Sequence, residues 1–286
     1  MYKYIFLFAV LFLTLFGACN SRTKLEKEVD ARLEQISRLI EDNNWNTAKN
    51  EIDTIHALYP RLVEKRRMAQ AYKDTIERRE AVKTIAYCDS MLNFKRHEAD
   101  SLQKMFGFEK NEQYQEHGSF VYKNLIIENN LDRSYLRAEV NETADFFLIS
   151  HYRGASKIAH NSLKVSTPDD FFAITDSIPE LIFKHSFTDD GIRWESVTFK
   201  NENASDVGMF IALHQQENIK VKLLGNRSIT YQLTPNDRKA ITETYKLWVV
   251  MSDVVRLKRE ILKSKAKIEQ IKERYTGQHP NTEDRV

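Results

Sequence analysis

Hydrophobic residues recur every seven positions near the C-terminal end of the chain. Residues 236–275 contain neither glycine nor proline. Two sets of positions, offset by three residues, are mostly apolar, as the a and d positions of a coiled coil are. We therefore expect one long helix over 235–275, with Thr234 as its cap and Pro235 in its first turn. The sets are Leu247, Val254, Ile261, Ile268 and Tyr275, and Val250, Leu257, Ser264 and Ile271.

A second helical pattern occupies residues 24–110, which contain one proline and one glycine. Two apolar stripes run along it at helical spacing. An apolar stripe must be covered by another element, so we expect these helices to pair antiparallel with the C-terminal helix. The stripes are Leu25, Val29, Leu33, Ile36 and Ile40, and Ala81, Ile85, Cys88, Leu92, Lys95, Ala99, Leu102 and Phe106.

Between the two stripes lies the segment "LIEDNNWNTAKNEIDTIHALYP", residues 39–60. Trp45 precedes Ala48, Ile52 and Ile55 at helical spacing, and Pro60 follows Ala48 by twelve residues. This stretch resembles one helical hairpin of the tetratricopeptide type. Stable arrays need about three or more repeats, and no second copy is found, so we expect a local hairpin without a peptide-binding array.

Alternating apolar and polar residues dominate the middle of the chain and predict strands. Residues 136–140, 207–213, 219–223 and 229–233 alternate, whereas the apolar run 146–149 predicts a strand buried on both faces. Asp190-Gly191 and Gly225-Asn226 are typical hairpin turns. About eight to ten antiparallel strands are expected, in a sandwich or a curved sheet.

Together these patterns predict an α+β fold, in which an antiparallel β domain is inserted at the tip of a long antiparallel helical or coiled-coil stalk. The expected boundaries are a signal peptide over 1–18, a helical region over 19–112 and a β domain over 113–234. The long helix over 235–275 and a disordered tail over 276–286 follow.

The first 18 residues have one charge, Lys3, and an apolar run over residues 4–16. That run is shorter than the roughly 20 residues that span a bilayer, and it is typical of a secretory signal peptide. Phe16-Gly17-Ala18-Cys19 resembles a bacterial lipobox, although that family prefers Leu, Val or Ile where Phe16 stands. The resemblance implies cleavage before Cys19, acylation of Cys19, and a membrane partner reached through its acyl chains. The alternative is a plain secretory signal with an incidental cysteine.

The lipobox resemblance implies a bacterial cell-envelope protein, anchored in the outer membrane and facing the periplasm, with exposure on the cell surface as an alternative. Without residues 1–18 the chain keeps 42 basic and 41 acidic residues. This balance argues against nucleic acid as a partner. Cys88 then has no second cysteine to pair with, and its place on an apolar helical stripe predicts burial.

Few residues suggest chemistry. The sequence contains no HExxH zinc motif, CxxC pair, nucleophile elbow or phosphate-binding loop, and we expect no metal, cofactor or catalytic set. His151, His160 and His214 lie on segments predicted to be neighbouring strands, so they form a speculative polar cluster. Isolated strand histidines are more often only hydrogen-bonded or solvated.

Residues 256–274 contain eight lysines and arginines but only three glutamates. Such a stripe could contact anionic lipid headgroups or a cell-wall polymer. The alternative is the solvated outer face of a paired helix.

The triplet Asp-Ser/Thr-aliphatic, with Met counted among the third residues, occurs five times, where this composition predicts roughly one. It resembles the O-glycan acceptor signature of envelope proteins in some Gram-negative anaerobes. An amphipathic helix also repeats a polar-polar-apolar order, so both interpretations stay open. The implied acceptors are Thr54, Thr75, Ser90, Ser101 and Ser177.

These observations favour a non-enzymatic envelope protein with a structural or docking role, whose unidentified partner is another envelope protein. The alternative is a module that binds a glycan or peptide on the β domain, with Tyr152 and Trp194 among its contacts. Aromatic residues of β domains are more often buried in the core.

Overall fold

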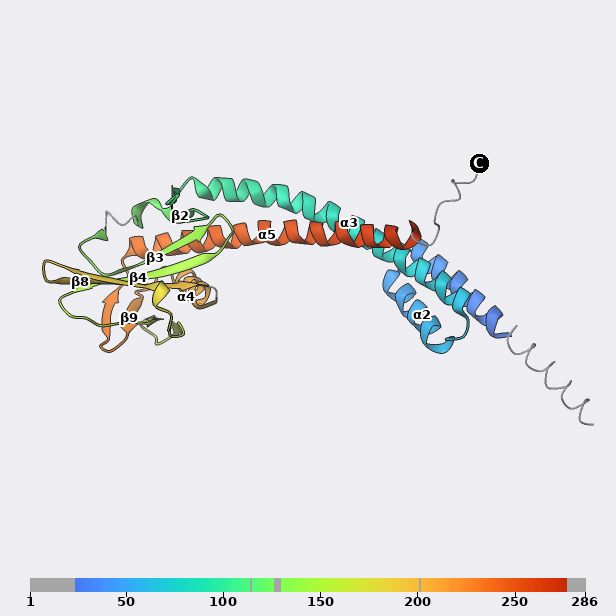
Figure 1. Ribbon diagram of the computed structural model, residues 1–286, viewed down its shortest axis with the longest axis horizontal. Coiled ribbons are helices and arrows are strands. Elements are labelled where there is room, and N and C mark those ends of the chain that lie inside the picture. The colour runs from blue at the N-terminus through green and yellow to red at the C-terminus, as the bar shows by residue number, and fades with distance from the viewer. Residues whose placement is uncertain (1–23, 114, 126–129, 201, 277–286) are drawn as a thin grey trace, which may run out of the picture. The chain divides into compact units, whose positions relative to one another are not determined.

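The computed structural model describes residues 24–113, 115–125, 130–200 and 202–276 (Figure 1). Cys19 and the apolar run before it lie outside the described residues. The chain divides into two compact units, unit 1 with residues 1–87 and 260–286 and unit 2 with residues 88–259. The long helices α3 (Val63–Gln103) and α5 (Pro235–Thr276) contribute residues to both units.

Unit 1 is helical. A helix over residues 24–41, helix α2 (Trp45–Leu58) and the first part of α3 surround one apolar core. Asn43 forms the first turn in a left-handed backbone conformation, with φ of 58°. The helical hairpin predicted around Trp45 is therefore present. The core consists of Val29, Leu33, Ile36, Ile40, Ala48, Ile52, Ile55, Tyr59, Ala69 and Ile76.

The end of α5 runs antiparallel to α3 within unit 1. Lys267 forms a 2.8 Å ion pair with Glu77 of α3, and Arg274 forms one of 3.1 Å with Asp74. The hydroxyl of Tyr275 donates to the same Asp74 carboxylate over 3.2 Å. Later residues of α5 thus face earlier residues of α3, as antiparallel pairing requires.

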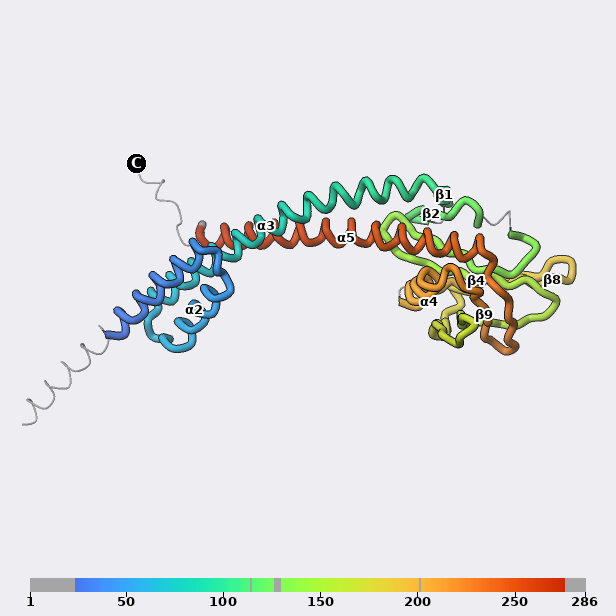
Figure 2. The backbone as a smooth tube through the Cα atoms, turned by 180° about the vertical axis from the view of Figure 1, so that it is seen from behind, coloured from blue at the N-terminus to red at the C-terminus, as the bar shows by residue number. Residues whose placement is uncertain are grey.

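Unit 2 contains two antiparallel sheets (Figures 1 and 2). The six-stranded sheet has the order β1-β2-β3-β4-β8-β7, so β1 and β7 are its edges. Its strands are β1 (Phe106–Glu109), β2 (Ser119–Tyr122), β3 (Tyr135–Asn141), β4 (Phe146–Gly154), β7 (Lys184–Asp189) and β8 (Ile192–Lys200). The Asp190-Gly191 turn joins β7 to β8, as the sequence predicts.

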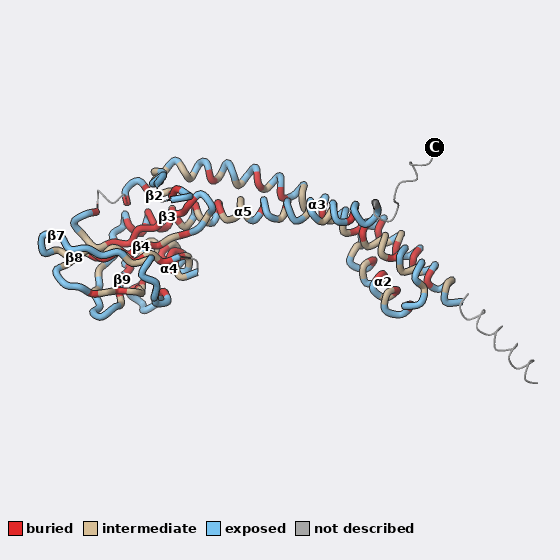
Figure 3. The backbone as a smooth tube through the Cα atoms, viewed as in Figure 1, coloured by how far each residue is buried: buried red, intermediate tan, exposed pale blue. Residues whose placement is uncertain are grey.

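The second sheet has four strands in the order β10-β9-β5-β6. Leu163, Val165, Val221 and Leu223 point inward from its central strands and share a core with Leu148 and Phe199 of the first sheet. Helix α4 (Glu202–Leu213) and the start of α5 complete this core. Figure 3 shows buried positions gathered where these layers meet. The strands are β5 (Ser162–Ser166), β6 (Phe172–Ile174), β9 (Lys220–Leu224) and β10 (Ile229–Gln232).

The start of α5 is fixed by a reciprocal cap. The Thr234 hydroxyl accepts from the Asp237 N–H over 3.1 Å, and the Asp237 carboxylate accepts from the Thr234 N–H over 3.0 Å. Asp237 is fully buried and also accepts from the Arg133 guanidinium at 2.6 and 2.7 Å. The predicted cap at Thr234 is therefore confirmed.

The two predicted apolar stripes are buried where they face each other in unit 2. Cys88, Leu92 and Ala99 of α3 are buried, as are Leu247, Val250 and Leu257 of α5. Lys95, the weak point of the α3 stripe, forms a 3.3 Å ion pair with Asp253 of α5. The predicted antiparallel pairing of these helices, and the burial of Cys88, are thus found within this unit.

Three predictions are wrong. Residues 207–213 belong to helix α4, because Ala204, Val207, Gly208 and Ile211 share one buried face at helical spacing. Gly208 lets that face approach the sheet, since a Cβ there would lie 2.9 Å from the Phe146 ring. The predicted helical region also extends too far: α3 ends at Gln103, and Phe106 begins strand β1.

The third wrong prediction is that residues 146–149 are buried on both faces of the sheet. Phe146 and Leu148 are buried, but Phe147 and Ile149 are only half-buried. The first pair faces the shared core. The second pair lies on the opposite face of the sheet, which no layer of that core covers.

The described helices include none with a stretch long and apolar enough to span a bilayer.

Candidate functional site

The three histidines predicted as a cluster lie in three different surroundings. His151 is on β4, and Ser196 Oγ of β8 lies 2.8 Å from its Nδ1. His160 precedes β5 and bonds to Ser150, the residue before His151, so it contacts the opposite face of β4. His214 follows α4 rather than lying on a strand, and its Nδ1 lies 2.6 Å from Glu217. The cluster of three is therefore wrong.

His160 instead joins a cluster that the sequence did not indicate. Its Nε2 lies 2.7 Å from Ser150 Oγ, and its Nδ1 lies 3.3 Å from a carboxylate oxygen of Glu195. Serine, histidine and glutamate in this order are the arrangement that activates a serine nucleophile in hydrolases. The arrangement of these three side chains therefore resembles a catalytic triad.

Burial argues for a structural role of this cluster. The exposed fractions of Ser150, His160 and Glu195 are 0%, 2% and 5%, so no substrate reaches the serine in this structure. Glu195 also accepts hydrogen bonds from the N–H groups of Ile158 at 3.0 Å and His160 at 3.3 Å. We therefore interpret the cluster as a clamp that fixes the loop of residues 155–161 to β8.

The electrostatics agree with such a clamp. Burial opposes the charge of Glu195, but hydrogen bonds from the backbone of the 158–160 loop and from His160 outweigh it and lower the pKa of Glu195. Burial also lowers the pKa of His160, which keeps its imidazole neutral. An ionised carboxylate held by N–H donors beside a neutral imidazole is a stable buried arrangement.

The opposite face of the six-stranded sheet is open in part and bears aromatic and cationic side chains. Trp194 of β8 stacks on Phe187 of β7, with ring centroids 6.0 Å apart, and the Arg153 guanidinium of β4 lies 5.5 Å from the Trp194 ring. The strand register places these three residues side by side. Tyr152, the other predicted aromatic contact, is buried in the core, and its hydroxyl donates to Ser156 O.

Two further exposed apolar side chains precede the edge strand β7. In the 3-10 helix η3 (Leu181–Phe183), just before β7, Leu181 is 81% and Ile182 is 74% exposed. Phe187 on β7 is also exposed. We call Leu181, Ile182 and Phe187 the β7 edge patch. Large exposed apolar side chains on and just before an edge strand are typical of an interaction surface.

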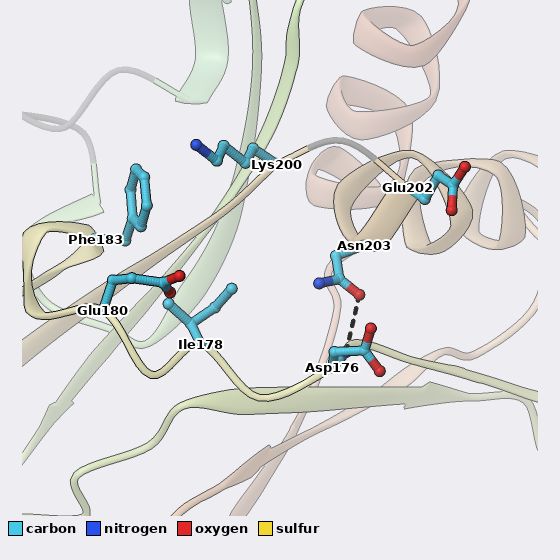
Figure 4. A pocket seen from close by; sticks show the side chains of 7 residues that line it. All are labelled: Asp176, Ile178, Glu180, Phe183, Lys200, Glu202 and Asn203. Atoms are coloured by element: carbon cyan, nitrogen blue, oxygen red, sulfur yellow. Dashed lines mark hydrogen bonds between the residues drawn. The ribbon is translucent and has the colours of Figure 1, made fainter.

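A cavity of about 490 Å³ is lined by the segment after β6, by η3, by the end of β8 and by the first turn of α4 (Figure 4). Among the described lining residues Lys200 has the only cationic side chain, and its Nζ lies 4.4 Å from the Phe183 ring. Figure 4 shows the carboxylates of Asp176, Glu180 and Glu202 spread around the cavity rather than directed at one point. Within the described ranges, no group of three or more His, Cys, Asp or Glu side chains is placed to hold a metal ion.

The five serines and threonines of the Asp-Ser/Thr-aliphatic triplets differ little in exposure. Thr75, Ser90, Ser101 and Ser177 are exposed, and Thr54 is half-exposed. Thr54 and Thr75 donate to backbone carbonyls one helical turn earlier. The following residues Ile55, Ile76 and Ile178 are buried, which agrees equally with an acceptor signature and with amphipathic patterning.

The basic stripe at the end of α5 is largely paired. Five of its eight cationic residues form ion pairs: Arg256 with Asp253, Lys263 with Glu260, Lys267 with Glu77, Lys272 with Glu269 and Arg274 with Asp74. This pairing favours the solvated face of a paired helix over a surface for anionic lipid.

Comparison with protein-family models, with curated proteins and with solved structures found no match for this chain. Functional inference therefore depends on the sequence patterns and on the geometry described above.

Proposed function

We propose that this chain is a lipid-anchored protein of the bacterial cell envelope with a non-enzymatic docking role, and that unit 2 holds the docking surface. The Phe16-Gly17-Ala18-Cys19 sequence supports the anchor, because small residues directly before a cysteine match the lipobox. The β7 edge patch supports the docking role. It places Leu181, Ile182 and Phe187 in solvent beside a strand whose outer edge pairs with no other strand of the described sheet.

The partner that fits the β7 edge patch is a protein with an extended segment. An added strand would form main-chain hydrogen bonds along β7 and cover the apolar side chains, which is the usual mode of recognition at an open sheet edge. Binding of such a partner is favourable because it buries the apolar side chains and pairs the outer edge of β7.

Site-specific photo-crosslinking tests the docking role. A benzophenone amino acid at position 187 should crosslink to a protein in intact envelopes, and Leu181→Asp with Ile182→Asp should remove that crosslink. The probe at Phe94, an equally exposed residue of α3, is the matched control. Equal crosslinking from both positions, or an unchanged pattern in the aspartate variant, would show that the β7 edge patch is no docking surface.

A separate experiment tests the anchor. Cys19→Ala should release the protein from envelope membranes and abolish incorporation of radiolabelled palmitate. Retention of label or of membrane association in this variant contradicts acylation at Cys19.

The helices α3 and α5 are proposed to form a coiled-coil spacer between the anchor and unit 2. This proposal is supported by the heptad pattern and by the ion pairs that join α3 to α5 in each unit. Removing residues 260–276 should expose apolar side chains of α3 and lower the solubility of the chain. An unchanged solubility would argue against this pairing.

A second candidate function is the binding of a glycan or peptide on the open face of the six-stranded sheet. The Arg153–Trp194–Phe187 stack favours it, because stacked aromatics that are open to solvent on one side recognise sugar rings and extended peptides, and Phe187 is exposed while Trp194 is half-buried. Trp194→Leu should abolish binding to a glycan array while leaving the position-187 crosslink in place. A variant that binds the array as the parent does removes this candidate.

A further inference from the structure

The outer face of the four-stranded sheet bears three lysines and, on its described strands, no acidic side chain. Alternate residues of its strands point away from the shared core, as Leu163 and Val221 on the inner face show. The outward positions include Lys164, Lys220 and Lys222. The other outward side chains on these strands are uncharged.

Two of these lysines face each other directly. Lys164 of β5 and Lys222 of β9 are cross-strand partners, and Lys220 lies two residues along β9 on the same face. Like charges at directly opposed positions destabilise an antiparallel sheet. None of the three lysines forms an ion pair with a carboxylate of the described residues, although Asp169 and Asp170 lie in the turn between β5 and β6.

Apolar side chains border the lysines on the same face. Phe172 and Ile174 of the edge strand β6 point outward beside Ser166 and Lys164, and each is more than half exposed. The Lys164 ammonium lies 3.8 Å from the Phe172 ring, so the cationic and apolar parts of the surface are continuous. Phe171, in the turn before β6, is exposed as well.

We propose that the outer face of the four-stranded sheet, with Lys164, Lys220, Lys222, Phe172 and Ile174, binds the surface of an anionic lipid bilayer. The lysines are attracted to anionic headgroups, and the protruding phenylalanine and isoleucine enter the interfacial layer between them. A dissolved polyanion would use the lysines but has no layer to receive Ile174. This contact differs from the proposed acyl anchor and does not depend on acylation of Cys19.

Vesicle sedimentation tests the proposal with the chain from residue 20 onward, which retains every residue that the structure describes. It should bind vesicles of phosphatidylcholine with 30 mol% phosphatidylglycerol and not vesicles of phosphatidylcholine alone. Each lysine near an anionic surface raises the affinity for that surface about fivefold. The triple variant Lys164→Gln, Lys220→Gln and Lys222→Gln should therefore bind the vesicles about a hundredfold more weakly. Raising the salt concentration to 0.5 M should also weaken vesicle binding by the parent protein, because salt screens the lysine charges.

The matched control replaces three exposed lysines elsewhere in unit 2, Lys104, Lys246 and Lys258, by glutamine. It changes the net charge equally and should bind as the parent does. If the control loses as much affinity as the triple variant, only net charge acts and the proposal is overturned. Circular dichroism and urea unfolding of each variant establish that the fold is retained.

A second variant separates a bilayer from a soluble polyanion. Phe172→Thr with Ile174→Thr keeps the lysines and should weaken vesicle binding about tenfold while leaving binding to long-chain polyphosphate unchanged. Should the parent bind polyphosphate but not the anionic vesicles, or should the threonine variant bind vesicles as tightly as the parent, the bilayer assignment is wrong.

Discussion

One serine–histidine pair lies on each face of strand β4, and the two pairs differ in the partner of the second ring nitrogen of the histidine. On the inner face Ser150 bonds to His160, whose second nitrogen faces Glu195. On the outer face Ser196 bonds to His151, whose Nε2 has no hydrogen-bond partner among the described residues. The same two residue types therefore serve a closed polar clamp on one face and an incomplete pair on the other.

The comparison shows that a triad-like set of atoms is not by itself a catalytic site. The inner pair has the carboxylate that a triad needs but no access for a substrate. The outer pair lies on the more open face, but no carboxylate of the described residues bonds to His151. Among the described residues neither pair combines the two requirements, so we assign a catalytic role to neither pair.

The largest effect is expected from the carboxylate of the inner cluster. Glu195→Ala leaves the buried N–H groups of Ile158 and His160 without an acceptor, so we expect a loss of about 4 kcal/mol in the free energy of unfolding. Urea unfolding followed by circular dichroism measures it. Glu217→Ala, which removes a half-exposed partner of His214, should cost less than about 1 kcal/mol. Equal losses would show that the loop 155–161 is not clamped.

The outer histidine should dominate the acid sensitivity of unit 2. Burial, and after it the positive charge of Arg137, lowers the pKa of His151 to about 4. The unfolded chain takes up this proton near pH 6.5, whereas the folded chain does so only near pH 4. The contribution of His151 to the free energy of unfolding is therefore fully present above pH 6.5 and is lost as the pH decreases toward 4. At about 1.4 kcal/mol for each pH unit, the loss is about 3 kcal/mol.

His151→Phe tests that loss, because phenylalanine preserves the stack on Tyr135, whose ring lies 4.5 Å from the imidazole. The variant cannot take up the proton, so its unfolding free energy should change less between pH 6.5 and pH 4 than that of the parent. An identical pH dependence in both proteins would place the acid sensitivity elsewhere.

The inner serine should matter for stability and not for chemistry. Ser150→Ala leaves His160 Nε2 buried without a partner and should cost about 2 kcal/mol. The parent protein should not react with a fluorophosphonate probe, because Ser150 is closed to solvent. Labelling of the parent that disappears in Ser150→Ala would replace the clamp by a serine hydrolase whose loop opens.

Much of the fold follows from periodicity. The heptad positions of α5 and the stripe of α3 predict buried faces because a long helix has one period along its length. Residues 207–213 mislead because Val207, Met209, Ile211 and Leu213 alternate while Ala204, Val207, Gly208 and Ile211 also fit a helix. Packing of α4 on β4 and β8 decides between the two patterns.

The clamp itself could have been found from the strand pattern. Glu195 occupies the same alternating set as Val197 and Phe199, and Ser150 the same set as Leu148 and Tyr152, all of which are buried. A polar residue on the buried face of a strand requires a polar partner. Periodicity does not identify that partner, because His160 arrives from a loop whose position depends on the packing of both sheets.

The smallest effect is expected at the outer serine, and it measures the difference between the two faces most directly. Ser196→Ala removes one hydrogen bond between two residues that are only half-buried, so about 0.5 kcal/mol should be lost. Comparison of the urea midpoints of Ser196→Ala and Ser150→Ala at pH 7 gives the ratio of the two costs. Because both changes remove a serine hydroxyl from a serine–histidine pair in neighbouring strands, equal costs would mean that burial does not distinguish the faces. A fourfold ratio would instead assign the structural role to the inner pair and leave the outer face available for binding.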